Sequence, residues 1–295
     1  MPNEFVAPQP QPERVDFFKN PDNIRELEQK LAYVSDMKPE VASFSESTEH
    51  TGLDIRNALE SVAGSKRKIK IEHNSERRKH IDKTEDRRYA ELVEHLIIDR
   101  INKWFADFYA TPASDFDNII RGVDIVITEK NSGHVGVGID VTTTPNIETL
   151  TVKMNRGWDK EHIHETSEVT FYKDAKGGKR KVSAMRFVVG IRRIDAIVLA
   201  QDCLSEGKET YPDNFFKYLI IMQMEEQLER WLDYCDENKS NPNVGAKSTQ
   251  CRSMKNFIER MKRSVDYDKV TQTLVFKNFA KDNLALTVAK ILRDY

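Results

Sequence analysis

Apolar residues recur at every third or fourth position from Thr84 to Tyr109, which predicts one long amphipathic helix. Two segments of alternating apolar and polar residues follow, Gly122–Thr128 and Val135–Thr142. The short polar loop between these segments predicts a β-hairpin. Strand patterns return at Glu168–Lys173 and Val182–Ile191, on either side of a glycine-containing turn. This mixture of helices and strands predicts an α/β fold.

Weaker amphipathic patterns predict additional helices on both sides of this central region. In chain order they lie near Asn23–Tyr33, Leu53–Val62, Pro145–Gly157, Asp195–Leu204 with Asp195 as its cap, Asn214–Cys235, Met254–Met261 and Asn283–Arg293, with a β-prone segment at 271–276. Four prolines among residues 1–20 predict an extended or unstructured tail. We therefore expect a helical and basic extension at 1–83, an α/β core at 84–235, and a linker with a helical accessory region at 236–295.

The composition limits the class of protein. Hydrophobic residues make up 39% of the 295 residues and charged residues 32%, which leaves enough apolar material for a folded core. No stretch approaches the roughly 18 consecutive apolar residues of a membrane span, and the N-terminus lacks the pattern of a secretion signal. The cysteines Cys203, Cys235 and Cys251 have no zinc-ligand spacing, which predicts reduced thiols. These features favour a cytoplasmic protein without a membrane partner.

Local charge, rather than net charge, determines whether nucleic acid is a plausible partner. The formal net charge of -2 gives no overall attraction to a polyanion. Basic residues nevertheless cluster between Lys66 and His80, and again between Lys176 and Lys181. Either cluster suits contact with phosphate, whereas the alternative is that both are ordinary solvated surfaces.

The predicted hairpin places two aspartates opposite each other. Period-two alternation in Val135–Thr142 puts Asp140 on the face away from the apolar side chains, and Asp124 has the same position in the preceding strand. A three-residue loop with glycine in the left-handed position makes Lys130 oppose His134. The pairs that this register predicts are Asp124 with Asp140, Ile125 with Ile139, and Ile127 with Val137.

Two facing carboxylates repel each other and need a compensating cation or a proton. A divalent cation such as Mg²⁺ or Mn²⁺ would meet this need, because hard cations prefer oxygen ligands. Gly136 and Gly138 lie on the same strand face as Asp140, where they leave room for a close-approaching backbone or substrate. The alternative is that both aspartates simply lie on the solvated face of the hairpin.

The order of a long helix, a strand with Asp124, a strand with Asp140, and then a helix and further strands resembles the PD-(D/E)xK nuclease superfamily. The resemblance covers residues 85–235 and implies a restriction-endonuclease-like core, in which a mixed central β-sheet is flanked by helices. It also implies that Asp124 and Asp140 are catalytic metal ligands. Thr142 departs from the pattern, because the family motif has lysine at this position.

The resemblance suggests which residues complete the site. Some family members carry the functional lysine elsewhere, so Lys153 is the first substitute candidate and Lys173 the second. Many members also have a glutamate on the helix before the first acidic strand. Glu91 and Glu94 are both candidates for this role, and the sequence does not separate them.

The leading functional hypothesis is a Mg²⁺- or Mn²⁺-dependent nuclease that hydrolyses phosphodiester bonds in DNA. A catalytically inactive nuclease-fold module that binds nucleic acid or a protein partner is the alternative, since Thr142 replaces the motif lysine. A purely structural interaction module is a third hypothesis. Two weaker signals remain: Gln223 and Gln227 either line the same cleft or are merely solvated, and His162 with His164 suggests a polar loop rather than a metal site.

Overall fold

A mixed five-stranded β-sheet forms the centre of the fold, with strand order β1-β2-β3-β5-β4. The computed structural model describes residues 17–76, 83–132, 135–143, 148, 150–153, 167–205, 213–241 and 244–266. The strands are β1 (Phe108–Pro112), β2 (Ile125–Glu129), β3 (Val135–Thr142), β4 (Ser167–Lys173) and β5 (Lys179–Gly190). Strands β3 and β5 run parallel, and the other neighbours are antiparallel. The predicted α/β class with a mixed sheet flanked by helices is therefore confirmed.

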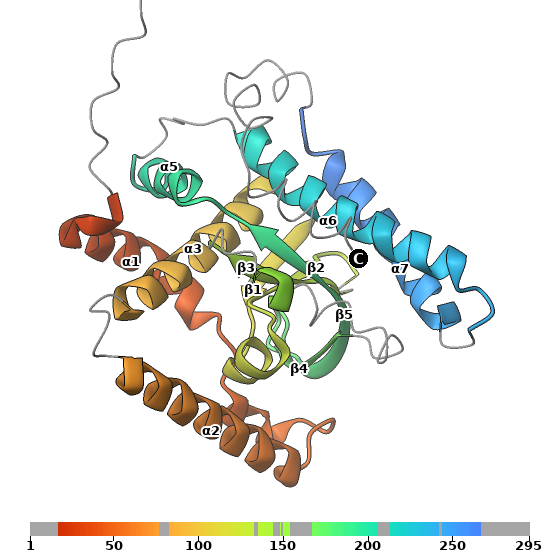
Figure 1. The fold of residues 1–295 in the computed structure, drawn as a ribbon, viewed down its shortest axis with the longest axis horizontal. Helices are drawn as coiled ribbons and strands as arrows, with labels where there is room; N and C mark the ends of the chain where they lie inside the picture. Colours follow the sequence, from red (N-terminus) through yellow and green to blue (C-terminus); the bar gives the residue numbers. More distant parts are fainter. Residues whose placement is uncertain are drawn as a thin grey trace, which may run out of the picture.

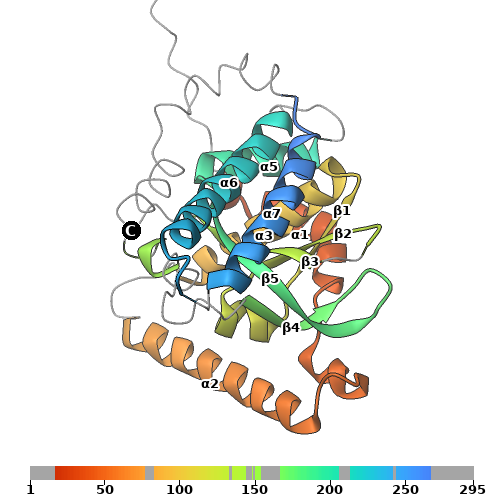
Figure 2. The same cartoon turned by 90° about the vertical axis from the view of Figure 1, so that its right-hand side faces the viewer.

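Helices surround this sheet on several sides (Figures 1 and 2). They are α1 (Pro21–Asp36), α2 (Gly52–Glu76), α3 (Lys83–Trp104), α5 (Arg193–Leu204), α6 (Asp213–Glu237) and α7 (Val244–Lys262), with short helices η1 (Phe17–Lys19), η2 (Val41–Glu46) and η3 (Asp117–Arg121). In both views α6 and α7 lie side by side, while α2 lies apart from them beside β4. In the part of the chain that the structure describes, no helix is long and apolar enough to cross a membrane.

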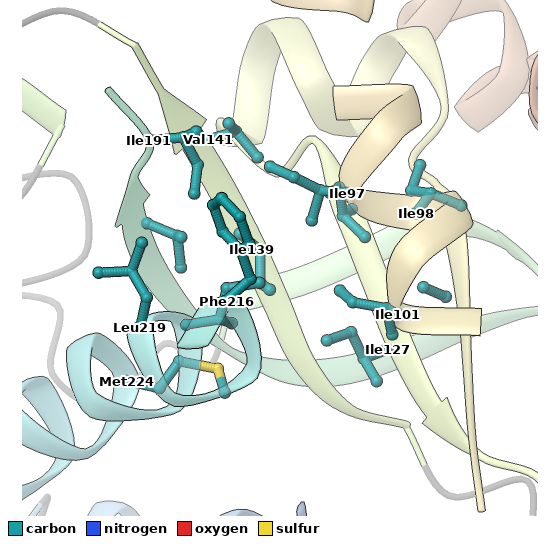
Figure 3. Close-up of a cluster of buried hydrophobic side chains, with 14 of the residues drawn as sticks. Ile97, Ile98, Ile101, Ile127, Ile139, Val141, Ile191, Phe216, Leu219 and Met224 are labelled. Atoms are coloured by element: carbon teal, nitrogen blue, oxygen red, sulfur yellow. The ribbon is translucent and has the colours of Figure 1, made fainter. Parts of the chain in front are cut away.

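The main hydrophobic core lies between the sheet and helices α3 and α6. Figure 3 shows Ile97 and Ile101 of α3 and Phe216 of α6 converging on the strand residues Ile127 and Ile139. All five side chains are almost completely buried. Burying an isoleucine or phenylalanine side chain contributes roughly 1.5–3 kcal/mol, so this layer is the main source of stability. Residues of α1 and α7, outside the expected 84–235 core, belong to the same cluster.

The outer edge of β5 is completed by glutamines instead of a strand. Strand β4 pairs with β5 only between Lys179 and Ala184. Beyond that point, the Gln227 side chain accepts a hydrogen bond from the Val188 N–H at 2.9 Å and donates one to the Val188 carbonyl at 2.8 Å. Gln223 binds Gly190 in the same way, at 2.8 and 3.2 Å. The interpretation of these glutamines as solvated is therefore wrong: they are buried because a primary amide can mimic the peptide group of a missing strand.

Asp117 in η3 supports the other edge strand, β4. The pairing of β4 with β5 is irregular between Val169 and Tyr172. At this point the N–H groups of Thr170 and Phe171 donate to the Asp117 carboxylate at 2.7 and 3.0 Å. Burial raises the pKa of Asp117, and these hydrogen bonds favour its charged form. The carboxylate thus satisfies backbone donors that the irregular ladder leaves unpaired.

The N-terminal half of α2 joins a small buried cluster with η2 and β4. Phe171 of β4 packs edge-on against Phe44 of η2, and the His50 ring stacks on Phe171 at 5.0 Å between centroids. Ile55 and Ala58 of α2 complete this small cluster. The contacts fix α2 relative to the sheet, although it stands apart from the other long helices.

The predicted helix from Thr84 to Tyr109 is wrong at its C-terminal end. Helix α3 ends at Trp104, and the edge strand β1 begins at Phe108. Asn102 accounts for part of this change, because its side chain accepts from the Ala110 N–H at 2.7 Å and donates to the Ala110 carbonyl at 3.0 Å. Trp104, Phe105 and Phe108 are all buried and also have helical spacing. The periodicity alone therefore did not distinguish the end of α3 from the start of β1.

Most other predicted elements are recovered with shifted ends, whereas of the helix predicted at Pro145–Gly157 only residues 148 and 150–153 are described, and these are helical. Helix α2 runs well beyond Val62, and α7 begins earlier than Met254. Asp195 is not the N-cap residue of α5, because the helix begins at Arg193 and Arg192 is its N-cap. The Asp195 carboxylate accepts hydrogen bonds from the Arg192 guanidinium instead. The expected tail is shorter, since Phe17 and Phe18 are buried in the main core. The elements predicted at 271–276 and 283–293 lie outside the described residues.

Candidate functional site

The predicted register of the hairpin is confirmed where the structure describes both strands. Ile125 pairs with Ile139 and Ile127 with Val137, before an irregularity at Thr128. The Asp124 N–H, immediately before β2, donates to the Ile139 carbonyl at 2.8 Å. This hydrogen bond continues the ladder toward the level of Asp140. The expected pairing of Lys130 with His134 lies outside the described residues.

Asp124 and Asp140 are both buried rather than solvated. Their relative exposures are 8% and 3%. The Asp124 Oδ2 accepts a hydrogen bond of 2.7 Å from the Val141 N–H, which ties this side chain to the neighbouring strand. An ionised group at such low exposure needs partners. The alternative of two aspartates on an open polar face is therefore wrong.

Lys153 is the first of these partners. Its Nζ lies 2.5 Å from Asp140 Oδ1 and donates to the Val141 carbonyl at 2.7 Å. Residues 150–153 are helical, and they follow β3 closely enough for the lysine to fold back onto the strand. Lys173 is exposed at the end of β4, and β5 separates it from β3. Of the two candidate lysines, the structure brings only Lys153 to the aspartates.

Arg186 of β5 is the second partner, and the sequence analysis missed it. Its Nη2 contacts Asp140 Oδ2, and its Nε donates to the Gly122 carbonyl at 2.8 Å. The parallel register places Arg186 beside Gly138, two residues before Asp140. Within the described interactions, Arg186 Nη1 has no hydrogen-bond partner although it is buried. A charged residue inside the apolar run Ala184–Ile191 was the available signal, because arginine is rarely buried unless it is paired.

Gly122 is required for this arrangement. Its φ angle of 68° lies in the left-handed region, which favours glycine. A Cβ atom at this position would lie 3.0 Å from Arg186 Nη2 and 3.5 Å from Asp140 Oδ2. Gly122 therefore ends η3 with the backbone turn that leaves room for the buried ion pair.

Burial and neighbouring negative charge perturb the acidic residues. Burial is the main cause that raises the pKa of Asp124 to about 7, and Asp140 raises it further. Lys153 and the Val141 N–H act in the opposite direction. Burial and the nearby Asp124 also raise the pKa of Glu94 well above its usual value, while Lys153 lowers it. Asp124 and Glu94 thus form one electrostatically coupled acidic group.

This coupling separates the two candidate glutamates. Glu94 is partly buried, and the charges of Asp124 and Lys153 act on the pKa of its carboxyl. Glu91, one turn earlier on α3, is exposed and acts on Glu94 as an additional negative charge. The structure therefore places Glu94 in the acidic group and Glu91 at its solvent side.

The cations that offset Asp140 belong to the chain itself. Sequence analysis predicted a compensating Mg²⁺ or Mn²⁺, and in the structure Lys153 and Arg186 contact the two oxygens of Asp140. Among the described residues, no group of three or more histidine, cysteine, aspartate or glutamate side chains has the geometry to hold a metal ion. Oxygen donors that suit a hard cation remain on Asp124 and Asp140.

Other predicted features do not contribute open space to this site. A Cβ atom on Gly136 would overlap the Phe257 ring of α7 at 2.4 Å, and one on Gly138 would lie 3.1 Å from Val123. The expectation that these glycines leave room for a substrate is therefore wrong. Thr142 is buried, and its carbonyl accepts a hydrogen bond from the Ile191 N–H. His162 and His164 lie outside the described residues.

The raised pKa of Asp124 predicts a pH-dependent stability in metal-free buffer. Above about pH 4 the unfolded chain loses the Asp124 proton, whereas the folded state retains it up to about pH 7. The free energy of unfolding therefore falls as the pH rises from about 4 toward 7. Asp124→Asn keeps an acceptor for the Val141 N–H but carries no charge. We expect the variant to match the parent below about pH 4 and to exceed its free energy of unfolding by on the order of 2 kcal/mol at about pH 5.5.

Denaturant titrations of both proteins in EDTA at a series of pH values measure this difference. If the free energies of unfolding of the parent and of Asp124→Asn changed with pH in parallel, Asp124 would not titrate as described. Asp22→Asn is the matched control, because Asp22 is an exposed aspartate on α1 whose replacement should give no comparable slope.

No protein-family model, curated protein or solved structure matches the chain.

Proposed function

We propose that this chain is a Mg²⁺- or Mn²⁺-dependent phosphodiesterase of the PD-(D/E)xK type that acts on DNA. The observation that carries the proposal is the contact between Lys153 Nζ and Asp140 Oδ1 at 2.5 Å, beside the coupled carboxyls of Asp124 and Glu94. Two acidic residues, a lysine and a helical glutamate are the groups that this nuclease pattern requires. The ion pair of Lys153 with Asp140 is a stronger argument than the short sequence motif alone.

The position of Lys153 offers a solution to the missing motif lysine. Thr142 is buried and carries no charge, so it cannot bind a phosphate as a lysine would. Lys153 reaches the same acidic strand from the helical segment that follows β3. The order of α3, β2, β3, this segment and β5 also supports a restriction-endonuclease-like core, because β5 returns parallel to β3.

The chemistry follows from these positions. A bound divalent cation would activate water and offset negative charge on a phosphate. Asp124 and Asp140 are the residues that would hold it, since their carboxylates are hard oxygen donors. The Lys153 side chain, with 26% relative exposure, is free to turn from Asp140 toward a phosphate oxygen. Arg186 remains behind Asp140 and orients it, and the raised pKa of Glu94 suits its carboxyl oxygen to accept a proton.

A metal-dependent cleavage assay on single- and double-stranded DNA tests this proposal. We expect cleavage with Mn²⁺ or Mg²⁺, no cleavage in EDTA, and loss of activity to the EDTA level in Asp140→Asn and Lys153→Met. Lys173→Met is the matched control, because this exposed lysine lies two strands away from β3 and its loss should leave the rate unchanged. Activity in Asp140→Asn equal to that of the parent would refute the assignment.

One observation favours a second function, a nuclease-like module that binds nucleic acid without cutting it. Both Asp140 oxygens already have cationic partners within the chain, so the site is neutralised without a metal ion. Calorimetric titration with Mn²⁺ separates the two functions. Absence of metal binding together with salt-sensitive binding of oligonucleotides would favour the binding module.

A further inference from the structure

A groove lies beside helix α2. Its volume is about 410 Å³, and it is bounded by the segment that joins α1 to η2 and by one face of α2. The volume falls within the range of roughly 300–1,000 Å³ that is typical of small-ligand pockets. Both ribbon views show that α2 lies apart from α6 and α7.

The groove combines an aliphatic surface with two lysines. Pro39, Val41, Leu59 and Val62 supply apolar side chains to its lining. Leu59 is 43% exposed, so its side chain is accessible from the groove. An aliphatic lining suits the flat face of an unpaired nucleobase, whereas the stacked bases of a duplex are not accessible to it.

Lys38 and Lys66 face each other across a single carboxylate. Their Nζ atoms lie 2.6 and 2.5 Å from the two oxygens of Asp115. All three side chains are partly exposed, so the ammonium groups have access to solvent. Each ammonium has three N–H donors, which leaves donors for a phosphate oxygen after the contact with Asp115.

The charge around the groove favours an anion at one end. Glu40 and Asp115 formally balance the two lysines that line the groove. Beyond Lys66, however, α2 continues with the exposed basic residues Arg67 and Lys68. The part of α2 that follows the groove is therefore locally basic, which the formal net charge of -2 conceals.

The groove lies close to the proposed active site. Asp115, which lines the groove, is two residues from Ala113, and the Ala113 N–H donates to the Asp124 carbonyl at 2.8 Å. We propose that the groove binds an unpaired nucleotide of the substrate strand, with its phosphate on Lys38 and Lys66 and its base against Leu59. This inference rests on the proposed function and names a single-stranded segment as the substrate.

Fluorescence anisotropy with a labelled oligothymidylate in EDTA, over a series of salt concentrations, tests the groove without cleavage. We expect Lys38→Ala and Lys66→Ala each to weaken binding severalfold and to reduce the salt-dependence slope by about 0.7. Asp115→Asn should tighten binding, because it leaves both ammonium groups free for phosphate. Lys239→Ala is the matched control, since Lys239 is an ion-paired surface lysine outside the groove and its loss should change neither quantity.

The opposite signs expected for Lys66→Ala and Asp115→Asn separate a phosphate site from a loss of folding, which would weaken binding in both variants. Unchanged affinity in both lysine variants would overturn the inference while metal-dependent cleavage still stands. Weakened binding without any cleavage by the parent protein would overturn the proposed function and leave the groove intact. Equal losses on single strands and blunt duplexes would overturn the assignment of an unpaired nucleotide.

Discussion

Replacing Arg186 by methionine is expected to lower the free energy of unfolding by roughly 3–5 kcal/mol, because the change removes one partner of a buried ion pair. Both side chains of the pair are almost inaccessible, with relative exposures of 2% for Arg186 and 4% for Asp140. The substitution also removes the donor that binds the Gly122 carbonyl at the end of η3. Denaturant unfolding at neutral pH measures the change.

Arg25→Met is the matched control for this prediction. Arg25 forms an ion pair with Asp22 on α1, but both side chains are largely exposed. Exposed pairs contribute roughly 0–1 kcal/mol, so the control should be close to the parent in stability. The double variant Arg186→Met with Asp140→Leu should recover much of the loss, because it removes the buried Asp140 charge that Lys153 alone would otherwise offset. A cost for Arg186→Met no larger than that of the control would mean that the ion pair is not buried.

Replacing Gln227 by leucine is the second large perturbation that we expect, at roughly 2–5 kcal/mol. The substitution leaves the N–H and the carbonyl of Val188 buried without partners, and each such loss costs roughly 1–3 kcal/mol. Leucine fills a similar volume, so the effect reports on the hydrogen bonds rather than on a cavity. The measurement is denaturant unfolding together with amide hydrogen exchange at Val188.

Gln201→Leu on α5 is the control, because Gln201 is exposed and surface substitutions usually change stability by less than about 0.5 kcal/mol. Gln223→Leu should resemble Gln227→Leu and should expose the Gly190 N–H to exchange instead. Unchanged exchange at Val188 in Gln227→Leu would show that another group protects this edge of β5.

Arg186 and the glutamines of α6 also hold the candidate site in one geometry. Arg186 holds Asp140 from β5, and the glutamines of α6 hold the backbone of β5 immediately beyond Arg186. A shift of β5 along its axis would therefore break the buried ion pair and the edge contacts together. Support of this kind keeps functional side chains in one geometry.

The amino-acid sequence by itself determined the local parts of this protein. Alternation in the two hairpin strands and the length of their loop predicted the pairing of Ile125 with Ile139, because side-chain direction and register depend on neighbouring residues only. The same reasoning predicted Asp124 and Asp140 at adjacent positions, and it named Lys153 among the candidate lysines. Helical periodicity predicted most helices, but it did not reveal that α3 ends before Phe108.

Only the tertiary structure decided which charges meet. Arg186 contacts Asp140 because β5 returns parallel to β3, a pairing between segments far apart in the chain. The roles of Gln223 and Gln227 depend on where β4 leaves β5, and the coupling of Glu94 to Asp124 depends on how α3 crosses the sheet. The physical reason is that periodicity reports which face of an element is buried, whereas burial energy is non-directional and does not specify the partner. Partners are decided by the packing of the whole chain.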